Sequence, residues 1–497
     1  MKAIVLLADS VNRRHLSIYG NPWVKTPSLE RLGRRSTVFT RHFAGSAPCM
    51  PARRDMMTGR LNFLERNWGP IEPFDHALPQ LLRARGLFTH LVTDHYHYLE
   101  IGGENYCQLF DTWECFRGQE SDPWVSRVTP PPLPEHLGQL NPHYVLNRER
   151  FRGEEDFPSP RTLRAATEWL AENREADDYL LWVEVFDPHE PFDVPEEYLR
   201  LYGDDFAGPL YFWPAYAPTD VSQEALRHVE RRYAALLTMT DQWLGRLFDL
   251  LDEQGRWDDT LVVFTTDHGF MFGEHGFMAK NYMPAYNEVF HIPLLVHLPG
   301  QETPGEPLAA LTQSVDLFPT LLDYFGVPLS ACRNRLHGRS LLPLLSGQSR
   351  AVRDVALYGY FGRNVNVTDG CYTYFRAAAR PDNSPLFLYT AMPTTFLHYF
   401  DVEHLRDVRD IEMGRYLSWT DFPVFRIPAA SIRMKDANQS FDRNQYVNRH
   451  LLFDLETDYA QEHPLENPAL ERRMLDLLRE ALGAHDAPPE QYVRLGL

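Results

Sequence analysis

Four patterns typical of buried strands, each followed at once by an aspartate, constrain the fold of this chain more than any other feature. The four apolar, β-branched runs cover Ala3–Ala8, Leu87–Thr93, Tyr179–Phe186 and Thr260–Thr266. Their alternation with amphipathic segments predicts an α/β fold, a sheet with helices on its faces. Ligands of open α/β sheets bind at the carboxyl ends of the strands. The aspartates that follow the strands are therefore expected at a site, and they are Asp9, Asp94, Asp187 and Asp267.

Amphipathic spacing predicts helices between these strands. They cover Pro27–Leu32, Ala77–Arg85, Thr162–Asn173 and Ser222–Leu251. Two irregular inserts rich in proline and aromatic residues interrupt the pattern, Gly102–Pro160 and Gly203–Thr219. Both are too long to be ordinary connections, so we expect loops that wall a pocket.

The length of 497 residues predicts two domains, because single hydrophobic cores stop growing below that size. Near Gly347–Arg353 the sequence changes to short runs rich in tyrosine and phenylalanine, such as Ala356–Phe361 and Cys371–Ala378. We predict a catalytic domain over 1–350 and a smaller α+β domain over 351–497. The smaller domain would have an antiparallel sheet and a closing helix at Ala469–Leu482.

The net charge of −19 argues against nucleic acid or an anionic membrane as a partner, because basic faces normally bind both. Only four lysines occur, Lys2, Lys25, Lys280 and Lys435.

No stretch approaches the roughly 20 apolar residues of a membrane span, which predicts a soluble protein. The apolar run at the N-terminus is short and ends in an acid rather than a cleavage site, so we predict a strand and a cytoplasmic protein.

One of five scattered cysteines lies in a distinctive run, Cys49–Arg53, which reads CMPAR and is followed by TGR at Thr58–Arg60. A lone cysteine is more often a buried structural residue, and five without a CxxC pair make a poor disulfide framework or zinc site. The run, however, resembles the signature of the type I sulfatases, within the alkaline phosphatase superfamily. That resemblance implies a large mixed sheet sandwiched by helices, and a formylglycine-generating enzyme that oxidises Cys49 to formylglycine.

The chemistry explains why such a modification is needed. A thiol catalyses sulfuryl transfer poorly, whereas a hydrated aldehyde offers one hydroxyl as nucleophile and a second whose deprotonation later expels sulfate. Arg53 follows Cys49 by one helical turn if a helix begins near Pro51, so its guanidinium can hold the modified residue or a metal ligand.

Two further segments resemble the metal-binding parts of the family. Leu6–Ser10 is similar to its first strand, which implies Asp9 as a metal ligand, although a strand-end aspartate is often just a helix N-cap. Many sulfatases carry a second acid where this chain has Ser10, which leaves Asp9 as the ligand from that loop. The run from Val263 resembles TSDHG…GDHG…K, which implies that Asp267 and His268 bind metal and that Lys280 contacts the sulfate. Oxygen ligands with one imidazole suit Ca²⁺ first, then Mn²⁺ or Mg²⁺, and the formylglycine from Cys49 would complete the ligand set.

Histidines complete the implied site. Phe186–Phe192 resembles the family's PHxP[FY] segment, so His189 would act as an acid or base at the sulfate, the alternative being a turn histidine fixed between prolines. Where sulfatases often have GKxH, this chain reads VTDHYHY at Val92–Tyr98 and lacks the lysine. Either His95 or His97 could supply the imidazole, and we favour His97 because an aromatic residue follows it. Without that lysine, the subsite could instead recognise a neutral or cationic part of the substrate.

The sequence thus predicts a sulfatase that uses formylglycine and a divalent cation. Two alternatives stay open, a phosphonate monoester or phosphodiester hydrolase and a non-catalytic sulfatase-like binding protein.

An acidic protein is a poor match for a long polyanionic glycan, so a small aryl or alkyl sulfate or a mono- or oligosaccharide sulfate is expected. A homo-oligomer is possible, and the sequence leaves this open. The inserts hold aromatic residues that could stack on sugar or aryl rings or pack on one another, among them Trp113, Trp124, Tyr144, Tyr211, Phe212 and Trp213.

Overall fold

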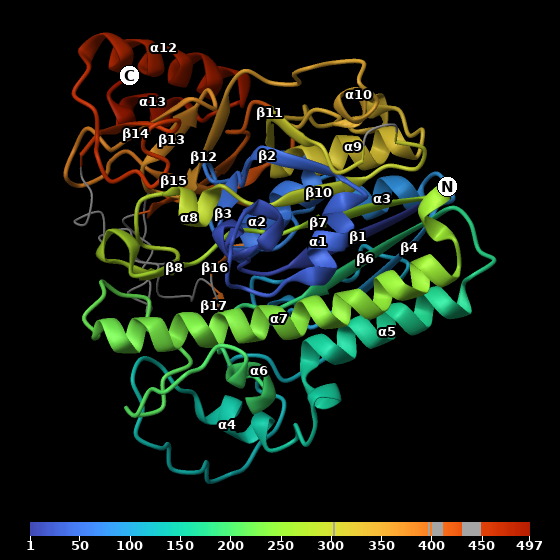
Figure 1. The fold of residues 1–497 in the computed structure, drawn as a ribbon. Helices are drawn as coiled ribbons and strands as arrows, with labels where there is room; N and C mark the ends of the chain where they lie inside the picture. The colour runs from blue at the N-terminus through green and yellow to red at the C-terminus, as the bar shows by residue number, and fades with distance from the viewer. Residues whose placement is uncertain (302–303, 396–397, 400–410, 430–448) are drawn as a thin grey trace.

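The structure is a computed structural model that describes residues 1–301, 304–395, 398–399, 411–429 and 449–497 (Figure 1). Lys435 lies outside these residues. An eight-stranded mixed sheet forms the centre of the molecule. Its strands, in order across the sheet, are β11 (Pro307–Gln313), β2 (Thr37–Phe43), β10 (Leu294–His297), β7 (Thr260–Thr265), β1 (Lys2–Ala8), β6 (Tyr179–Val185), β4 (Phe88–Thr93) and β5 (Thr112–Cys115). The α/β fold is confirmed, and the four predicted strands form to within one residue at each end.

The register of the sheet brings the strand-end aspartates to one edge. β1 pairs in parallel with β6 and β7, and β4 pairs in parallel with β6, whereas β10 is antiparallel to both of its neighbours. Leu7 pairs with Thr265, so Asp9 and Asp267 leave the sheet at the same level. The carboxyl ends of the four predicted strands therefore lie together, as the sequence predicted.

Helices cover both faces of the sheet (Figure 1). Ile4 and Leu6 of β1 pack on one face with α1 (Pro27–Arg34), α5 (Pro158–Glu172) and α7 (Gln223–Glu253). Ala3 and Val5 point to the other face, which α2 (Cys49–Thr58), α3 (Leu78–Arg83) and α9 (Leu317–Tyr324) cover. This alternation explains why β1 is apolar throughout, since a strand covered on both faces has no solvent side. α5 begins four residues before the predicted Thr162, because Pro158 suits the first helical position.

A second sheet has five strands, in the order β20 (Leu451–Asp454), β14 (Tyr372–Arg376), β13 (Val365–Thr368), β12 (Ala356–Tyr360) and β3 (Ser46–Ala47). The four C-terminal strands are antiparallel, and α12 (Pro468–Ala484) packs on them through Met474 and Leu478. β3 pairs in parallel with β12 and ends two residues before Cys49 in the chain. The smaller sheet therefore includes residues from the N-terminal part, and the division at residue 350 stays a prediction.

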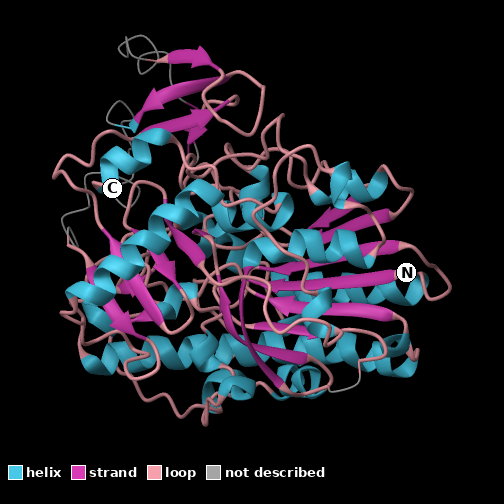
Figure 2. Cartoon of the chain, turned by 90° about the horizontal axis from the view of Figure 1, so that it is seen from above, coloured by secondary structure: helices cyan, strands magenta, loops and turns pink. Residues whose placement is uncertain are grey.

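The other sheets are small. β15 (Phe387–Thr390), β19 (Val424–Pro428) and β18 (Glu412–Gly414) form a three-stranded antiparallel sheet beside the larger ones (Figure 2). Besides several 3-10 helices, the further short elements in the described ranges are β8 (Met271–Phe272), β9 (Met278–Ala279), β16 (Thr394–Thr395), β17 (His398–Tyr399), α4 (Pro142–Arg148), α6 (Glu196–Arg200), α8 (Asn287–Phe290), α10 (Leu342–Leu345) and α13 (Pro489–Leu495).

The first insert is more ordered than the sequence indicated, because it contributes β5 to the edge of the main sheet and contains α4. β5 is short and largely exposed, so it lacks the apolar pattern that identified the inner strands. Tyr144, Phe212 and Trp213 pack against one another.

All five cysteines are free. Among the described helices, none combines the length and apolar character that a bilayer crossing requires.

Candidate active site

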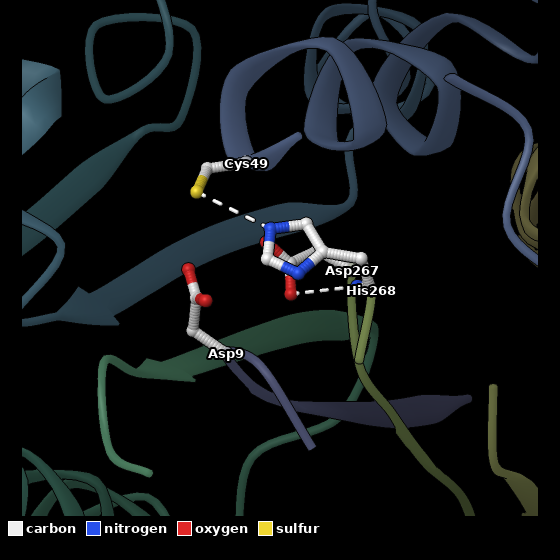
Figure 3. Close-up of side chains that lie close together, drawn as sticks. All are labelled: Asp9, Cys49, Asp267 and His268. Carbon is white, nitrogen blue, oxygen red and sulfur yellow. Dashed lines mark hydrogen bonds and ion pairs between the residues drawn. The ribbon is translucent and has the colours of Figure 1, made fainter. Parts of the chain in front are cut away.

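Four side chains converge beyond the carboxyl ends of β1 and β7, and we call them the primary cluster (Figure 3). Asp9 follows β1, Asp267 and His268 follow β7, and Cys49 is the first residue of α2. One ligand atom from each lies within 4.8 Å of the others, and all four residues are buried. The sequence-predicted metal ligands are thus brought together, although 257 residues lie between Asp9 and Asp267 in the chain.

Arg53 holds the carboxylates of this cluster. One turn of α2 after Cys49, its Nη2 donates to Asp9 at 2.8 Å and its Nη1 to Asp267 at 2.6 Å, while Nε donates to Glu184. Burial by itself would lower the pKa of Arg53, but the three carboxylates outweigh it and raise this pKa well above its usual value. The guanidinium therefore stays charged and fixes the acids in position.

Glu184 was not singled out from the sequence. It lies inside the apolar strand β6, and the hydroxyl of Tyr98 donates to its Oε2 at 2.8 Å. Burial raises the pKa of Glu184 despite the adjacent Arg53. The sequence did offer one signal for Glu184: it is the only acid in an apolar strand that helices cover on both faces. A charge in such a strand is rarely buried without a partner.

Ser10 links the cluster to Lys280. Its hydroxyl donates to Asp9 Oδ1 at 2.7 Å and accepts from Lys280 Nζ at 2.8 Å. Burial opposes ionisation of Asp9, but Arg53, Lys280 and His268 outweigh it and lower the pKa to about 2. Ser10 thus connects an acid to a cation at the position where many sulfatases carry a second acid.

His268 faces Cys49 with its unprotonated nitrogen. Nδ1 lies 3.0 Å from the carbonyl oxygen of Gly269, so it carries the proton and donates it. Nε2 then points its lone pair toward Cys49 Sγ at 3.3 Å. Burial lowers the pKa of His268, and burial together with Asp9 raises the pKa of the Cys49 thiol well above its usual value. An unmodified Cys49 would therefore be a neutral thiol rather than a reactive thiolate.

The primary cluster fits a divalent cation. Three buried carboxylates, from Asp9, Asp267 and Glu184, exceed the charge of Arg53 and Lys280, and uncompensated buried charge is costly. Two carboxylates and an imidazole whose other nitrogen donates to a carbonyl are suitable ligands.

A second group, which we call the acidic cluster, comprises Glu120, His189 and Glu190, with one side-chain ligand atom from each within 4.8 Å of the others. His189 Nδ1 lies 2.5 Å from the carbonyl oxygen of Glu190 and donates to it, so Nε2 is left for other contacts. Lys280 Nζ lies 3.4 Å from Glu190 Oε2. Glu190 also accepts from the hydroxyl of Tyr216, a residue of the second insert. Glu120, Glu190 and Tyr216 were not predicted.

The two histidines after β4 lie differently. His95 is fully buried, its Nδ1 lies 3.9 Å from Asp9 Oδ2, and neither ring nitrogen has a hydrogen-bond partner in the described part of the chain. His97 instead pairs with Glu100 at 2.5 Å and with Glu120 at 3.4 Å. Burial opposes protonation of His97, but these acids raise its pKa to about 9. His95 therefore borders the primary cluster, and His97, the residue favoured from the sequence, borders the acidic cluster.

Asp94 and Asp187 lie in a separate group. Gln119 donates to both, at 2.8 Å to Asp94 and 3.1 Å to Asp187, and the hydroxyl of Ser159 donates to Asp94 at 2.7 Å. Burial raises the pKa of Asp94 to about 6 and that of Asp187 to about 8. Two of the four strand-end aspartates thus contribute to the primary cluster, and the other two fix the first insert.

This fold and site define a hydrolase of the alkaline phosphatase superfamily. Residues 2–327 match the family Sulfatase, and the chain belongs to the sulfatase family as a type I sulfatase. A multifunctional alkaline phosphatase superfamily protein, PehA of Trinickia caryophylli, is 29% identical over 65% of this chain and 72% of its own length. A choline-sulfatase of Rhizobium meliloti is 26% identical over 76% and 78%. The phosphonate monoester hydrolase structure of Agrobacterium radiobacter superposes with a TM-score of 0.68 at 20% identity, covering 97% of this chain and 95% of that one.

Proposed function

We propose that this protein hydrolyses sulfate esters through a formylglycine derived from Cys49 and a divalent cation, Ca²⁺ as first choice, held by Asp9, Asp267, His268 and residue 49. The convergence of these four side chains within 4.8 Å carries the proposal. The substrates are small aryl or alkyl sulfates or mono- or oligosaccharide sulfates. Maturation requires a formylglycine-generating enzyme.

The chain's own residues have distinct roles in this proposal. The cation supplies polarisation of the sulfate oxygens when bound. Arg53 keeps Asp9 and Asp267 ionised and oriented, and Lys280 adds positive charge beside the sulfate. One hydroxyl of the formylglycine hydrate attacks sulfur as the ester oxygen leaves. The second hydroxyl then loses its proton, the aldehyde re-forms and sulfate departs.

The leaving alcohol needs a proton, and either His189 or Lys280 could supply it. His189 donates from Nδ1 to the Glu190 carbonyl, and burial lowers its pKa well below the usual value, so its Nε2 holds a lone pair. His189 can therefore pass a proton to the ester oxygen only after Nε2 has accepted one, such as the proton that the attacking hydroxyl loses. Lys280 contacts Glu190 as well as Ser10, and although burial lowers its pKa, Glu190 leads the groups that raise it above the usual value.

A decisive test examines residue 49 itself. After expression beside a formylglycine-generating enzyme, the peptide that contains Cys49 should have the mass of an aldehyde or its hydrate. Cys49→Ala should lose at least about 10³-fold in kcat for 4-nitrophenyl sulfate, the scale on which removing a catalytic nucleophile acts. Cys371→Ala is the matched control, because Cys371 is also a free cysteine but lies outside the site. An unmodified thiol together with full activity of Cys49→Ala would overturn the mechanism.

Hydrolysis of phosphonate monoesters or phosphodiesters is the second candidate. It is supported by the fold that this chain shares with two phosphonate monoester hydrolases, from Agrobacterium radiobacter and Silicibacter pomeroyi. Paired kcat/KM values for 4-nitrophenyl sulfate and for a 4-nitrophenyl phosphonate monoester separate the two. A larger value for the phosphonate ester would favour this second candidate.

A further inference from the structure

Lys280 lies between the primary and acidic clusters and joins them. Its Nζ is 2.8 Å from Ser10 Oγ on one side and 3.4 Å from Glu190 Oε2 on the other. A sulfate ester bound at the primary cluster and contacted by Lys280 therefore has the acidic cluster next to its alcohol part. This step rests on the proposed function.

Solvent exposure indicates the direction in which that alcohol extends. The residues of the primary cluster are at most 3% exposed, and His189 and Glu190 are equally buried. The side chain of Glu120 is 14% exposed, the highest value in either cluster. Among the residues of the two clusters, Glu120 is therefore the one most open to a leaving group that extends toward solvent.

An independent observation points to a polar ligand in this region. His95 is 0% exposed, and neither of its ring nitrogens has a hydrogen-bond partner among the described residues. Its ring lies 5.2 Å from that of His97, which contacts Glu120, and its Nδ1 lies 3.9 Å from Asp9. His95 thus borders the primary cluster through Asp9 and packs against His97, the residue that contacts the acidic cluster. Burying a polar group without a hydrogen-bond partner is costly, and a bound polar ligand would offset that cost.

Glu120 is fixed in a way that suits ligand binding. The preceding residue, Gln119, is anchored by Asp94 and Asp187. Tyr96 donates to Oε2 of Glu120 at 2.7 Å, and His97 contacts the same oxygen, so Oε1 is the oxygen that can accept from a ligand. A carboxylate accepts hydrogen bonds only. The group it recognises must therefore be a donor, and an anion in its place would be repelled.

We propose that Glu120 and the acidic cluster bind hydroxyl or ammonium donors on the alcohol part of the substrate, next to the sulfate ester. The site thus selects sulfate esters of polyols, sugars or amino alcohols over those of plain hydrocarbon alcohols. A leaving group with a carboxylate or second sulfate at this position is disfavoured.

Binding to the Cys49→Ala variant tests this without turnover. Titration calorimetry with Ca²⁺ present compares glucose 6-sulfate with cyclohexylmethyl sulfate, which has the same primary ester and a similar ring but no hydroxyls. A third ligand, 2-aminoethyl sulfate, distinguishes ammonium from hydroxyl donors. We expect glucose 6-sulfate, 2-aminoethyl sulfate or both to bind about tenfold more tightly than cyclohexylmethyl sulfate, the scale of one hydrogen bond to a charged group.

Glu120→Gln in the same background should abolish most of that preference, and Glu135→Gln, an exposed acid of the same insert, should keep it. The ratio of kcat/KM for the same esters should change in parallel in the matured enzyme. Equal binding of all three ligands, or a preference that survives Glu120→Gln, would overturn the inference. If Glu120→Gln does not fold, the affinities of the three ligands for the protein that retains Glu120 decide the inference alone. Failure of the matured enzyme to cleave any sulfate ester would instead contradict the proposed function, while the binding ratio still tests the acidic cluster.

Discussion

Two pairs of aspartates follow strands of the same sheet, yet their environments differ completely. Asp9 and Asp267, after β1 and β7, share the guanidinium of Arg53, whereas Asp94 and Asp187, after β4 and β6, share the neutral amide of Gln119. A cationic neighbour keeps a buried carboxylate ionised, and an amide compensates much less of the cost of burial. The same local pattern therefore gives a charged site at one pair of strands and a structural anchor at the other.

Removing the guanidinium of Arg53 is the most direct test of the pair that it binds, Asp9 and Asp267. Arg53→Met leaves the carboxylates of Asp9, Asp267 and Glu184 without their buried partner, which should lower the free energy of unfolding by about 3–5 kcal/mol. We also expect at least about a 10³-fold loss in kcat/KM, since both acids lose their orientation. Urea denaturation and sulfate ester kinetics measure the two effects. Arg31→Met, at an exposed ion pair with Asp249, is the control and should change stability little. An Arg53→Met protein as stable and active as its parent would contradict this account of the cluster.

Matched aspartate substitutions compare the two pairs. Asp267→Asn should lower metal affinity and kcat by about 10–100-fold or more, because a ligand and a partner of Arg53 are lost. Asp187→Asn should retain activity within a few-fold, since its partners are Gln119 and Ser159 rather than the primary cluster. Calorimetric Ca²⁺ titration and kinetics on both variants check this. Similar losses in both would show that the second pair belongs to the catalytic machinery.

A substitution at Glu184 should perturb Asp9 and Asp267 less, because Glu184 reaches them only through Arg53. Glu184→Gln removes one of three acids on Arg53 but retains an acceptor for Tyr98, so we expect about a tenfold decrease in kcat/KM with little change in KM. Tyr98→Phe should cost less, because it removes only the hydroxyl that donates to Glu184. A larger loss in Tyr98→Phe than in Glu184→Gln would show that the tyrosine acts independently of Arg53.

The pair that Gln119 binds, Asp94 and Asp187, predicts a modest dependence of stability on pH. Burial raises the folded-state pKa of Asp187 to about 8, above the value of about 3.9 in an unfolded chain. The folded state therefore binds this proton more tightly, and the resulting stability is complete below about pH 4 and lost as the pH rises through about 8. Asp187→Asn should reduce the decline in melting temperature between pH 5 and 8. Thermal melts across this range measure it, and an unchanged decline in the variant would indicate that Asp187 is ionised throughout.

The sequence by itself determined much of the fold and the reactive part of the site. Two-sided apolar strands predicted the sheet, and the motifs around Cys49, Asp9 and Asp267 identified side chains that the structure brings together. Local patterns suffice here because a buried parallel strand must be apolar throughout and its end must carry the polar residues of the site.

Only the tertiary structure decided which polar residues share an environment. Glu184 on Arg53, Ser10 between Asp9 and Lys280, and Glu120 beside His189 are contacts between segments far apart in the chain. Likewise, nothing local distinguishes Asp94 from Asp9. The charge state of a buried carboxylate depends on what packs against it from elsewhere, so the same strand-end aspartate becomes part of the site only where the fold places a cation next to it.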